Sequence, residues 1–341
     1  MTTCVRVVVV GAGPAGLLAA GALAAYADEV VVLDRDRLPR EPVPREGVAQ
    51  DRHWNRVSRR GVAAIEGLFP GFTAEAVAAG GRSEQGGLAV RRPLAEALMR
   101  RRVAALPHVR VKGRISAIDL LLDDHERRVR GVVVADLDRG STSHLAAALV
   151  VDASGQRTRV PAWLGRRGMD VVEERVRLNA TFVTREFLRA VTSTCDPLVT
   201  RHVLPDRQGR SSWGSAAVVM AMGDRWLVTL GGTHGLRPPT DLAGFISYAT
   251  DVCEPLGRLL RCRPAVGEAA VHRQPAMITR RIDRPTDFPA GLLLTGDAWR
   301  TLDPLEGSGL STAADAAVAL ADEARRVPIE HLGRAWLDQH A

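Results

Sequence analysis

A glycine-rich turn near the N-terminus constrains this chain most, because it joins two stretches of opposite character. Residues 5–10 are almost all valine and predict a buried strand, and residues 14–26 predict a helix that proline opens. A second valine-rich strand at 30–34 completes a βαβ unit within about 30 residues. The turn reads Gly-x-Gly-x-x-Gly and contains Gly11, Gly13, Ala15 and Gly16. The sequence therefore predicts a Rossmann unit that binds a dinucleotide.

Each glycine of this turn has its own physical role. Gly11 permits the tight turn, Gly13 lets the backbone approach a pyrophosphate, and Gly16 lets the helix pack closely on the strand. Asp34 ends the second strand, where its carboxylate can accept hydrogen bonds from a ribose diol. The turn alone does not distinguish FAD from NAD.

A second motif, close to the C-terminus, favours a flavin. Residues 292–315 read LLLTGDAWRTLDPLEGSGLSTAAD, so a buried strand ends at Gly296-Asp297 and a helix opens near Gly309. Asp297 is placed to reach ribityl hydroxyls. The backbone N–H groups of Gly309 and Leu310 can stabilise negative charge on the pyrimidine edge of a reduced flavin. We therefore expect the cofactor to be FAD.

Composition and charge exclude several other classes of protein. The net charge is +7, but the basic residues are dispersed among acidic ones, so we expect no nucleic-acid partner. The spacing of the cysteines fits neither a zinc site nor a CxxC motif, so no metal is expected; they are Cys4, Cys195, Cys253 and Cys262. No signal peptide and no run of 18 apolar residues is visible, which predicts a cytoplasmic protein without a membrane span. The oligomeric state stays open.

Together, the two motifs resemble those of the FAD-dependent group A flavoprotein monooxygenases, which have the aromatic-hydroxylase-type fold. Within this class the chain is most similar to the epoxidases that act on polyene polyketides in polyether pathways, and more distantly to squalene epoxidases. The resemblance covers most of the chain and lies in VVLDRDRLP at 31–39, PREGVAQDRH at 44–53, RRPLAEALMRRR at 91–102, LVVDASGQRTRVPAWL at 149–164, DRWLVTLGGT at 224–233 and FPAGLLLTGDA at 288–298.

The resemblance implies an α/β fold in which a Rossmann-like FAD-binding domain, three-layered and of glutathione-reductase type, contains an inserted mixed-sheet α+β substrate domain. The discontinuous FAD-binding domain is expected at 1–75, 90–170 and 276–341. The substrate-binding domain is expected at 76–89 and 171–275. Its clearest predicted element is a hairpin in which strands 216–222 and 225–230 flank a Gly223-Asp224 turn.

The resemblance also assigns residues to the cofactor. The positions implied near the adenosine and the diphosphate are Asp34 on the ribose, Arg35 beside it, and Arg92. The positions implied near the ribityl chain and the flavin are Arg45, Gln50, Asp297, Pro304, Gly307 and Gly309. A mid-chain Asp–Gly motif, implied to shape the cofactor and reductant side, contains Asp152, Gly155 and Arg159.

The implied activity is monooxygenation. NAD(P)H would reduce the flavin, oxygen would form a flavin hydroperoxide, and one oxygen atom would pass to a small hydrophobic polyene or polyketide of secondary metabolism, as in antibiotic biosynthesis. Such chemistry needs no protein nucleophile, so no catalytic residue is nominated. His53, Trp54 and His234 are candidate pocket residues, although a structural role is the commoner one for a histidine.

Three other functions remain open from the sequence. A non-redox cyclase on the same FAD scaffold fits two departures: the segment 80–92 looks short, and Glu306 puts a carboxylate in the flavin loop. Glu306 would disfavour a reduced flavin anion, act as an acid or base, or point to solvent. An isoprenoid-type double-bond reductase is the second alternative, and a pure binding protein the third. A flavin halogenase is rejected, because the sequence lacks its WxWxIP motif and its flavin-side lysine.

Overall fold

The computed structural model describes residues 4–45, 47–123, 125, 127–189, 199–282 and 288–340, so Cys195 lies outside the described residues. Its centre is a five-stranded parallel sheet in the order β16-β10-β1-β2-β6. The strands are β1 (Arg6–Val10), β2 (Glu29–Leu33), β6 (Val109–Lys112), β10 (Leu149–Asp152) and β16 (Leu292–Leu294). β1 lies at the centre of this sheet and β16 at one edge, so segments from near both ends of the sequence build one sheet.

The parallel sheet is covered on both faces, which explains why its strands are apolar throughout. Val7 and Val9 face a helical layer, whereas Val8 faces a small antiparallel sheet and α5 (Val160–Gly165). The helical layer contains α1 (Pro14–Leu23), α2 (Arg59–Leu68), α3 (Phe72–Ala78), α4 (Arg92–Ala104), α8 (Gly309–Ala324) and α9 (Ile329–His340). The small sheet contains β7 (Ile115–Asp123), β8 (Arg128–Asp136) and β9 (Ser141–Ala146). The predicted Rossmann-like, three-layer arrangement is thereby confirmed.

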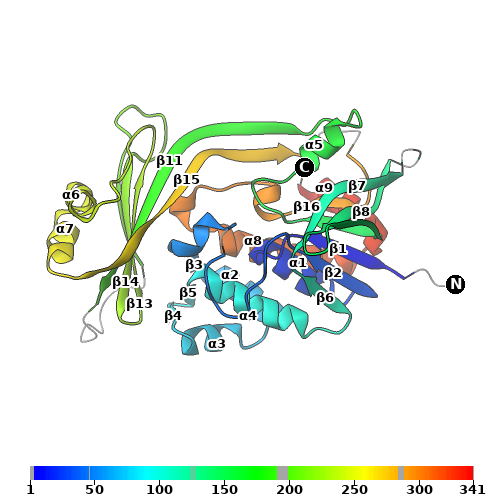
Figure 1. The fold of residues 1–341 in the computed structure, drawn as a ribbon, viewed down its shortest axis with the longest axis horizontal. Coiled ribbons are helices and arrows are strands. Elements are labelled where there is room, and N and C mark those ends of the chain that lie inside the picture. The colour runs from blue at the N-terminus through cyan, green and yellow to red at the C-terminus, as the bar shows by residue number, and fades with distance from the viewer. Residues whose placement is uncertain are drawn as a thin grey trace.

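A second large sheet stands apart from the first (Figure 1). Its order is β12-β13-β14-β11-β15. The sequence predicts a mixed sheet here, and every described pairing is antiparallel. Its strands are β11 (Val172–Leu188), β12 (Val199–Leu204), β13 (Ser215–Met222), β14 (Arg225–Gly232) and β15 (Ala265–Arg281). The predicted hairpin is confirmed as β13–β14, and α6 (Leu242–Val252) and α7 (Glu254–Arg261) pack on one face of the sheet.

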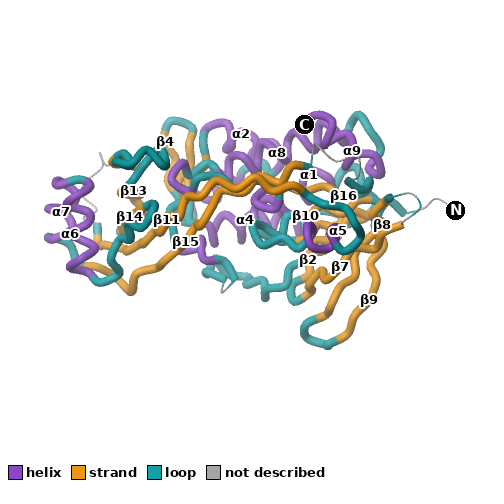
Figure 2. Tube along the Cα trace, turned by 90° about the horizontal axis from the view of Figure 1, so that it is seen from above, coloured by secondary structure: helices purple, strands orange, loops and turns teal. Residues whose placement is uncertain are grey.

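Two long strands join the sheets. β11 and β15 each have 17 residues, pair with each other, and run from the second sheet to the neighbourhood of α5 (Figures 1 and 2). The predicted domain boundary at 275/276 falls inside β15, which crosses it as one continuous strand. The domain boundaries therefore stay a prediction.

Short elements complete the described chain. A three-stranded sheet is formed by β3 (Arg56–Val57), β5 (Gly87–Ala89) and β4 (Arg82–Glu84). Single 3-10 turns occur at η1 (Ala49–Arg52), η2 (Gly296–Ala298) and η3 (Pro304–Glu306). Among the described helices, none has the length and apolar character needed to cross a bilayer.

Candidate functional site

A groove runs over the carboxyl ends of the parallel strands and consists of two adjoining hollows. The outer pocket lies over Gly11 and Asp34, and the inner pocket lies between the N-terminus of α8 and the second sheet. The lining shared by both hollows is Gly13, Arg92, Ala153 and Gly155. The inner pocket encloses about 1100 Å³ of space that is partly open to solvent. This is the edge of a parallel sheet at which open α/β folds bind their ligands.

The glycine turn has the geometry that the motif predicts. Gly11 has a φ of +108°, and a Cβ there would lie 2.4 Å from the Ala153 carbonyl oxygen. A Cβ on Gly16 would lie 1.9 Å from the Gly11 carbonyl oxygen, so only glycine lets α1 start so close to β1. Ala15, which lies within the motif, lines the inner pocket, where its methyl approaches Gly296.

Three other glycines expose backbone to the groove. A Cβ on Gly13 would meet only the Arg92 Nη2 atom, at 3.6 Å, and a Cβ on Gly155 or Gly309 would meet nothing within 4 Å. All three line the groove, so their missing side chains expose backbone where a ligand would lie. Such a cradle fits the diphosphate and ring system of FAD, which needs close backbone approach.

Asp34 lies in the outer pocket, as the ribose prediction requires. Its Oδ2 atom accepts a hydrogen bond of 2.8 Å from the Ala12 N–H, and its Oδ1 atom accepts one of 2.8 Å from the Asp36 N–H. These bonds hold the carboxylate at the end of β2, facing the turn. Arg35 also lines the outer pocket, where its exposed side chain lies 3.7 Å from Asp36.

Arg45 lies among carboxylates, close to Asp34. It lines the outer pocket and contacts Asp34 at 3.2 Å, Asp36 at 3.4 Å and Glu96 at 2.9 Å. Burial alone would lower the pKa of its guanidinium, but Glu96, Asp34 and Asp36 outweigh burial and raise that pKa. Three carboxylates thus hold the Arg45 side chain beside Asp34 in the outer pocket, and its implied contact with the ribityl–flavin end stays a prediction.

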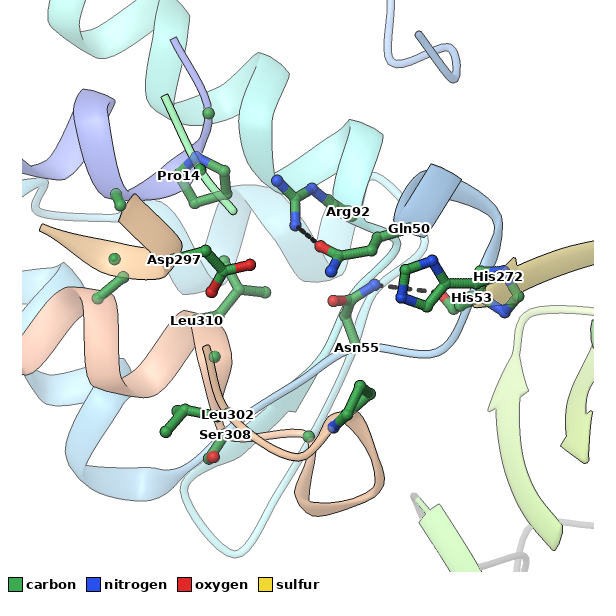
Figure 3. A pocket seen from close by; sticks show the side chains of 18 of the residues that line it. Pro14, Gln50, His53, Asn55, Arg92, His272, Asp297, Leu302, Ser308 and Leu310 are labelled. Atoms are coloured by element: carbon green, nitrogen blue, oxygen red, sulfur yellow. Dashed lines mark hydrogen bonds between the residues drawn. The ribbon is translucent and has the colours of Figure 1, made fainter. Parts of the chain in front are cut away.

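Gln50 and Arg92 do lie together at the inner pocket (Figure 3). The Arg92 Nη1 atom donates to the Gln50 Oε1 atom at 2.6 Å, and its Nε atom donates to Glu96 at 3.0 Å and approaches Asp51 at 3.3 Å. Its Nη2 atom faces Gly13 at the junction of the two pockets. Arg92 is thus fixed where the diphosphate of a bound dinucleotide would cross the glycine turn, which fits its predicted role.

The loop before α8 forms one wall of the inner pocket. Asp297, Pro304, Gly307, Gly309 and Leu310 all line it, and Figure 3 shows the Asp297 carboxyl and Leu310 beside the cavity. Gly307 has a φ of +63°, and a Cβ there would lie 2.1 Å from the Trp54 ring. Among the residues that the structure describes, no side chain caps the start of α8, so its first N–H groups are available to a ligand. Burial raises the pKa of Asp297, against the opposing effects of Arg92 and Arg280.

The mid-chain motif divides between the pocket and its support. Gly155 and Arg159 line the outer pocket, whereas Asp152 lines neither hollow. Asp152 is buried at the end of β10, where it accepts a hydrogen bond of 3.0 Å from the Ser154 N–H and another from the Thr158 hydroxyl. Burial raises the pKa of its carboxyl. Asp152 therefore shapes the turn that carries Gly155.

The structure also places the residues whose roles were open. His53 and Trp54 line the inner pocket, whereas His234 lines none of the pockets found in the described residues. Glu306 is exposed and lies outside the inner pocket, which matches the reading in which it points to solvent. Its carboxylate therefore does not face the space that a flavin would fill.

Arg280 is a buried residue that sequence reasoning missed. From β15 it donates to the backbone carbonyl oxygens of Asp297 at 3.2 Å, Ala298 at 3.0 Å and Gln156 at 3.2 Å. Its Nε atom also pairs with Glu173 of β11 at 2.9 Å. One side chain thus ties both pocket-lining loops to the two long strands. Arg280 belongs to no local sequence motif, so its role becomes visible only when the fold places β15 beside the two loops.

Comparison with known proteins agrees with this fold. Residues 4–66 match the family model described as "FAD binding domain". A curated relative, Protein Rv3254 of Mycobacterium tuberculosis, is 29% identical over 336 residues, which span 89% of this chain and 69% of the relative.

Solved structures share the fold across different chemistries. The flavin-dependent brominase Bmp2 superimposes with a TM-score of 0.71 at 18% identity, covering 97% of this chain and 82% of Bmp2. The flavin-dependent monooxygenase PieE, solved with FAD and substrate, gives 0.70 at 17% identity, with coverage of 98% and 62%. The Diels-Alderase PyrE3 gives 0.66 at 19% identity, with coverage of 96% and 69%. The chain therefore has the FAD-binding fold of flavin monooxygenases, and this fold alone does not select one reaction.

Proposed function

We propose that this protein is an FAD-dependent monooxygenase that epoxidises or hydroxylates a hydrophobic small molecule, with NAD(P)H as the reductant. The observation that carries the proposal is the groove in which the glycine-rich outer pocket adjoins a second pocket between α8 and the second sheet. A bound flavin supplies the chemistry, transferring one atom of O2 to the substrate while the other leaves as water. A polyene or polyketide substrate and a role in antibiotic biosynthesis belong to the same proposal.

The chain's own residues would hold and orient the cofactor. Asp34 and Arg35, which line the outer pocket, would hold the ribose. Arg92, which lines both pockets, would reach the diphosphate, and Asp297, in the inner pocket, would reach the ribityl chain. The N-terminus of α8 favours negative charge at the ring end of the inner pocket. Trp54 and Leu310 add apolar cover there, which keeps bulk water from the reacting atoms.

Turnover of oxygen is the measurement that tests this function. The purified protein should retain FAD, visible in its absorbance spectrum, and should consume O2 and NAD(P)H in step with oxygenated product when given a polyene substrate. Loss of NAD(P)H and O2 without product would show an uncoupled oxidase. Protein that never retains FAD would contradict the proposal and favour a binding role without a flavin.

A non-redox cyclase is the second candidate, since the fold is shared with the Diels-Alderase PyrE3 at a TM-score of 0.66. The exposed position of Glu306 removes one reason for it, because the carboxylate lies outside the pocket. Ring closure of a polyene without consumption of O2 or NAD(P)H would decide for the cyclase. Saturation of a double bond with NAD(P)H and without O2 would instead indicate a reductase.

A further inference from the structure

The end of the inner pocket that lies against the second sheet is polar. Leu302, Leu310 and Ala313 line the α8 side of the pocket, as an apolar substrate would require. The opposite end is lined by His53, Asn55, Phe182, Thr229, His272 and Gln274. A hydrocarbon lying there would cover five polar side chains and contact one apolar ring.

His53 carries the clearest unmet hydrogen-bonding capacity at this end. Its side chain is buried, with 7% of its surface exposed, and its Nδ1 atom lies 2.7 Å from the Thr184 Oγ1 atom. Thr184 Oγ1 lies in turn 2.6 Å from Thr229 Oγ1, so the ring is held from the sheet side. The His53 Nε2 atom is buried and has no hydrogen-bond partner within the described part of the chain. A buried polar atom without a partner is costly, and a ligand can supply the partner.

His272 repeats the pattern beside it. The two imidazole rings lie with their centroids 5.7 Å apart, and the His272 Nε2 atom likewise lacks a partner among the residues that the structure describes. Figure 3 shows both rings at the same end of the pocket. Two adjacent imidazoles with free nitrogens are a recognition surface for hydrogen-bonding atoms.

The charge of these rings restricts the ligand. Burial and the neighbouring His272 lower the pKa of His53 to about 3, and burial lowers the pKa of His272 as well. Both rings are therefore neutral near pH 7, and each has one N–H donor and one acceptor. Arg92, a cation that lines the same pocket, already pairs with Glu96 at 3.0 Å and Asp51 at 3.3 Å. A carboxylate or phosphate buried at the two imidazoles would therefore lack a free counter-charge, whereas a hydroxyl or carbonyl would be satisfied.

We propose that the substrate carries a neutral hydrogen-bonding group, a hydroxyl or a carbonyl, and that His53, held by Thr184, recognises it at the second-sheet end of the inner pocket. The inference rests on the proposed function, because it takes this pocket to be the substrate pocket. It narrows the hydrophobic substrate to one with an oxygenated end, and it makes Thr184 a positioning residue that acts through His53.

Binding of three matched probes tests the proposal without turnover. Naphthalene, 2-naphthol and 2-naphthoate present one ring system with no polar group, a neutral hydroxyl and an anion. Titration calorimetry on the protein as purified should give a dissociation constant for 2-naphthol about tenfold below that for naphthalene, in line with one buried hydrogen bond. Naphthoate should bind most weakly. Equal affinities, tightest binding of naphthoate, or no binding of naphthol overturns the proposal.

Substitutions at His53 and Thr184 test whether these two residues cause the preference for naphthol. His53→Phe should remove the advantage of naphthol over naphthalene, and Thr184→Val should reduce it, while Thr184→Ser should keep it. Thr181→Val is the matched control, because Thr181 is buried in the same strand but faces away from Thr184 by the alternation of β11. Loss of the preference in the control as well, or its survival in His53→Phe, contradicts the assignment. A failure of oxygen uptake with this ranking intact would count against the monooxygenase and leave the recognition site standing.

Discussion

At the scale of single residues, His53 stands out because it is a titratable group that the fold keeps uncharged. Its folded pKa of about 3 lies below the ordinary value of 6.5, since burial and His272 disfavour the imidazolium. Between these two values the unfolded chain binds a proton that the folded chain does not. The contribution of His53 to stability is therefore complete above pH 6.5 and is lost progressively as the pH falls toward 3.

The lowered pKa of His53 predicts that wild type and His53→Phe differ in how their free energies of unfolding depend on pH. From pH 7 to pH 5, wild type should lose about 2 kcal/mol more free energy of unfolding than the variant, at about 1.4 kcal/mol per pKa unit. Urea titrations of both proteins at the two pH values give the number. Parallel losses in both proteins would mean that His53 titrates normally in the folded state.

Residues set by local backbone geometry could be predicted from sequence, whereas residues set by distant partners could not. Gly11 is required by its own φ of +108°, and Gly16 by its contact with the Gly11 carbonyl within the same turn, so the motif alone indicates both. The surroundings of Arg45 could not be predicted, because Asp34, Asp36 and Glu96, which hold it, come together only in the fold. Arg280, His272 and Gln274 come from one long strand with no motif. Only tertiary pairing brings His272 and Gln274 to the pocket and Arg280 to the loops beside it.

At the scale of elements, the start of α8 is the part of the site most open to a ligand. Gly309 occupies the first turn, and a Cβ there would meet no atom of the described residues within 4 Å. The strand, turn and helix around it could be predicted from sequence, because hydrophobic periodicity and glycine placement are local signals. The position of α8 opposite the second sheet could not be predicted, because it depends on the path of the paired strands β11 and β15 between the two sheets.

Gly309→Leu should therefore weaken FAD retention without weakening the fold. The leucine would project into space that the cofactor needs, so the dissociation constant for FAD should rise by at least about tenfold, while the melting temperature of the cofactor-free protein changes by less than about 2 °C. Gly67→Leu is the control, because Gly67 is also helical, exposed and free of contacts within 4 Å but lies far from the groove in α2. Equal FAD affinity in the two variants would show that α8 does not contact the cofactor.

At the scale of the whole molecule, the two halves are joined by paired strands that are each 17 residues long. Arg280 fixes this ribbon to the two loops of the groove through three backbone carbonyls and Glu173. Movement of the second sheet relative to the first would therefore be transmitted to the loop that carries Asp297.

Arg280→Lys should loosen this connection, because an ammonium cannot replace the planar fork that reaches all four partners. Each lost bond to a buried carbonyl costs about 1–3 kcal/mol, so we expect a melting temperature lower by several degrees and weaker FAD binding. Arg281→Lys is the matched control, since that residue pairs with the half-exposed Glu174. Calorimetric melting and FAD titration of both variants make the comparison, and identical behaviour would contradict a clamping role for Arg280.

The contribution of both chain ends to one parallel sheet has a consequence for biosynthesis. β1 and the glycine turn leave the ribosome first, but their neighbour β10 follows more than a hundred residues later, and β16 and α8 later still. The cradle is therefore open on one side until translation has passed Leu310, and a growing chain cannot retain its cofactor before that point. The segment from β1 to β16 must therefore wait for α8 with its apolar strands half covered, and it needs protection from aggregation during that interval.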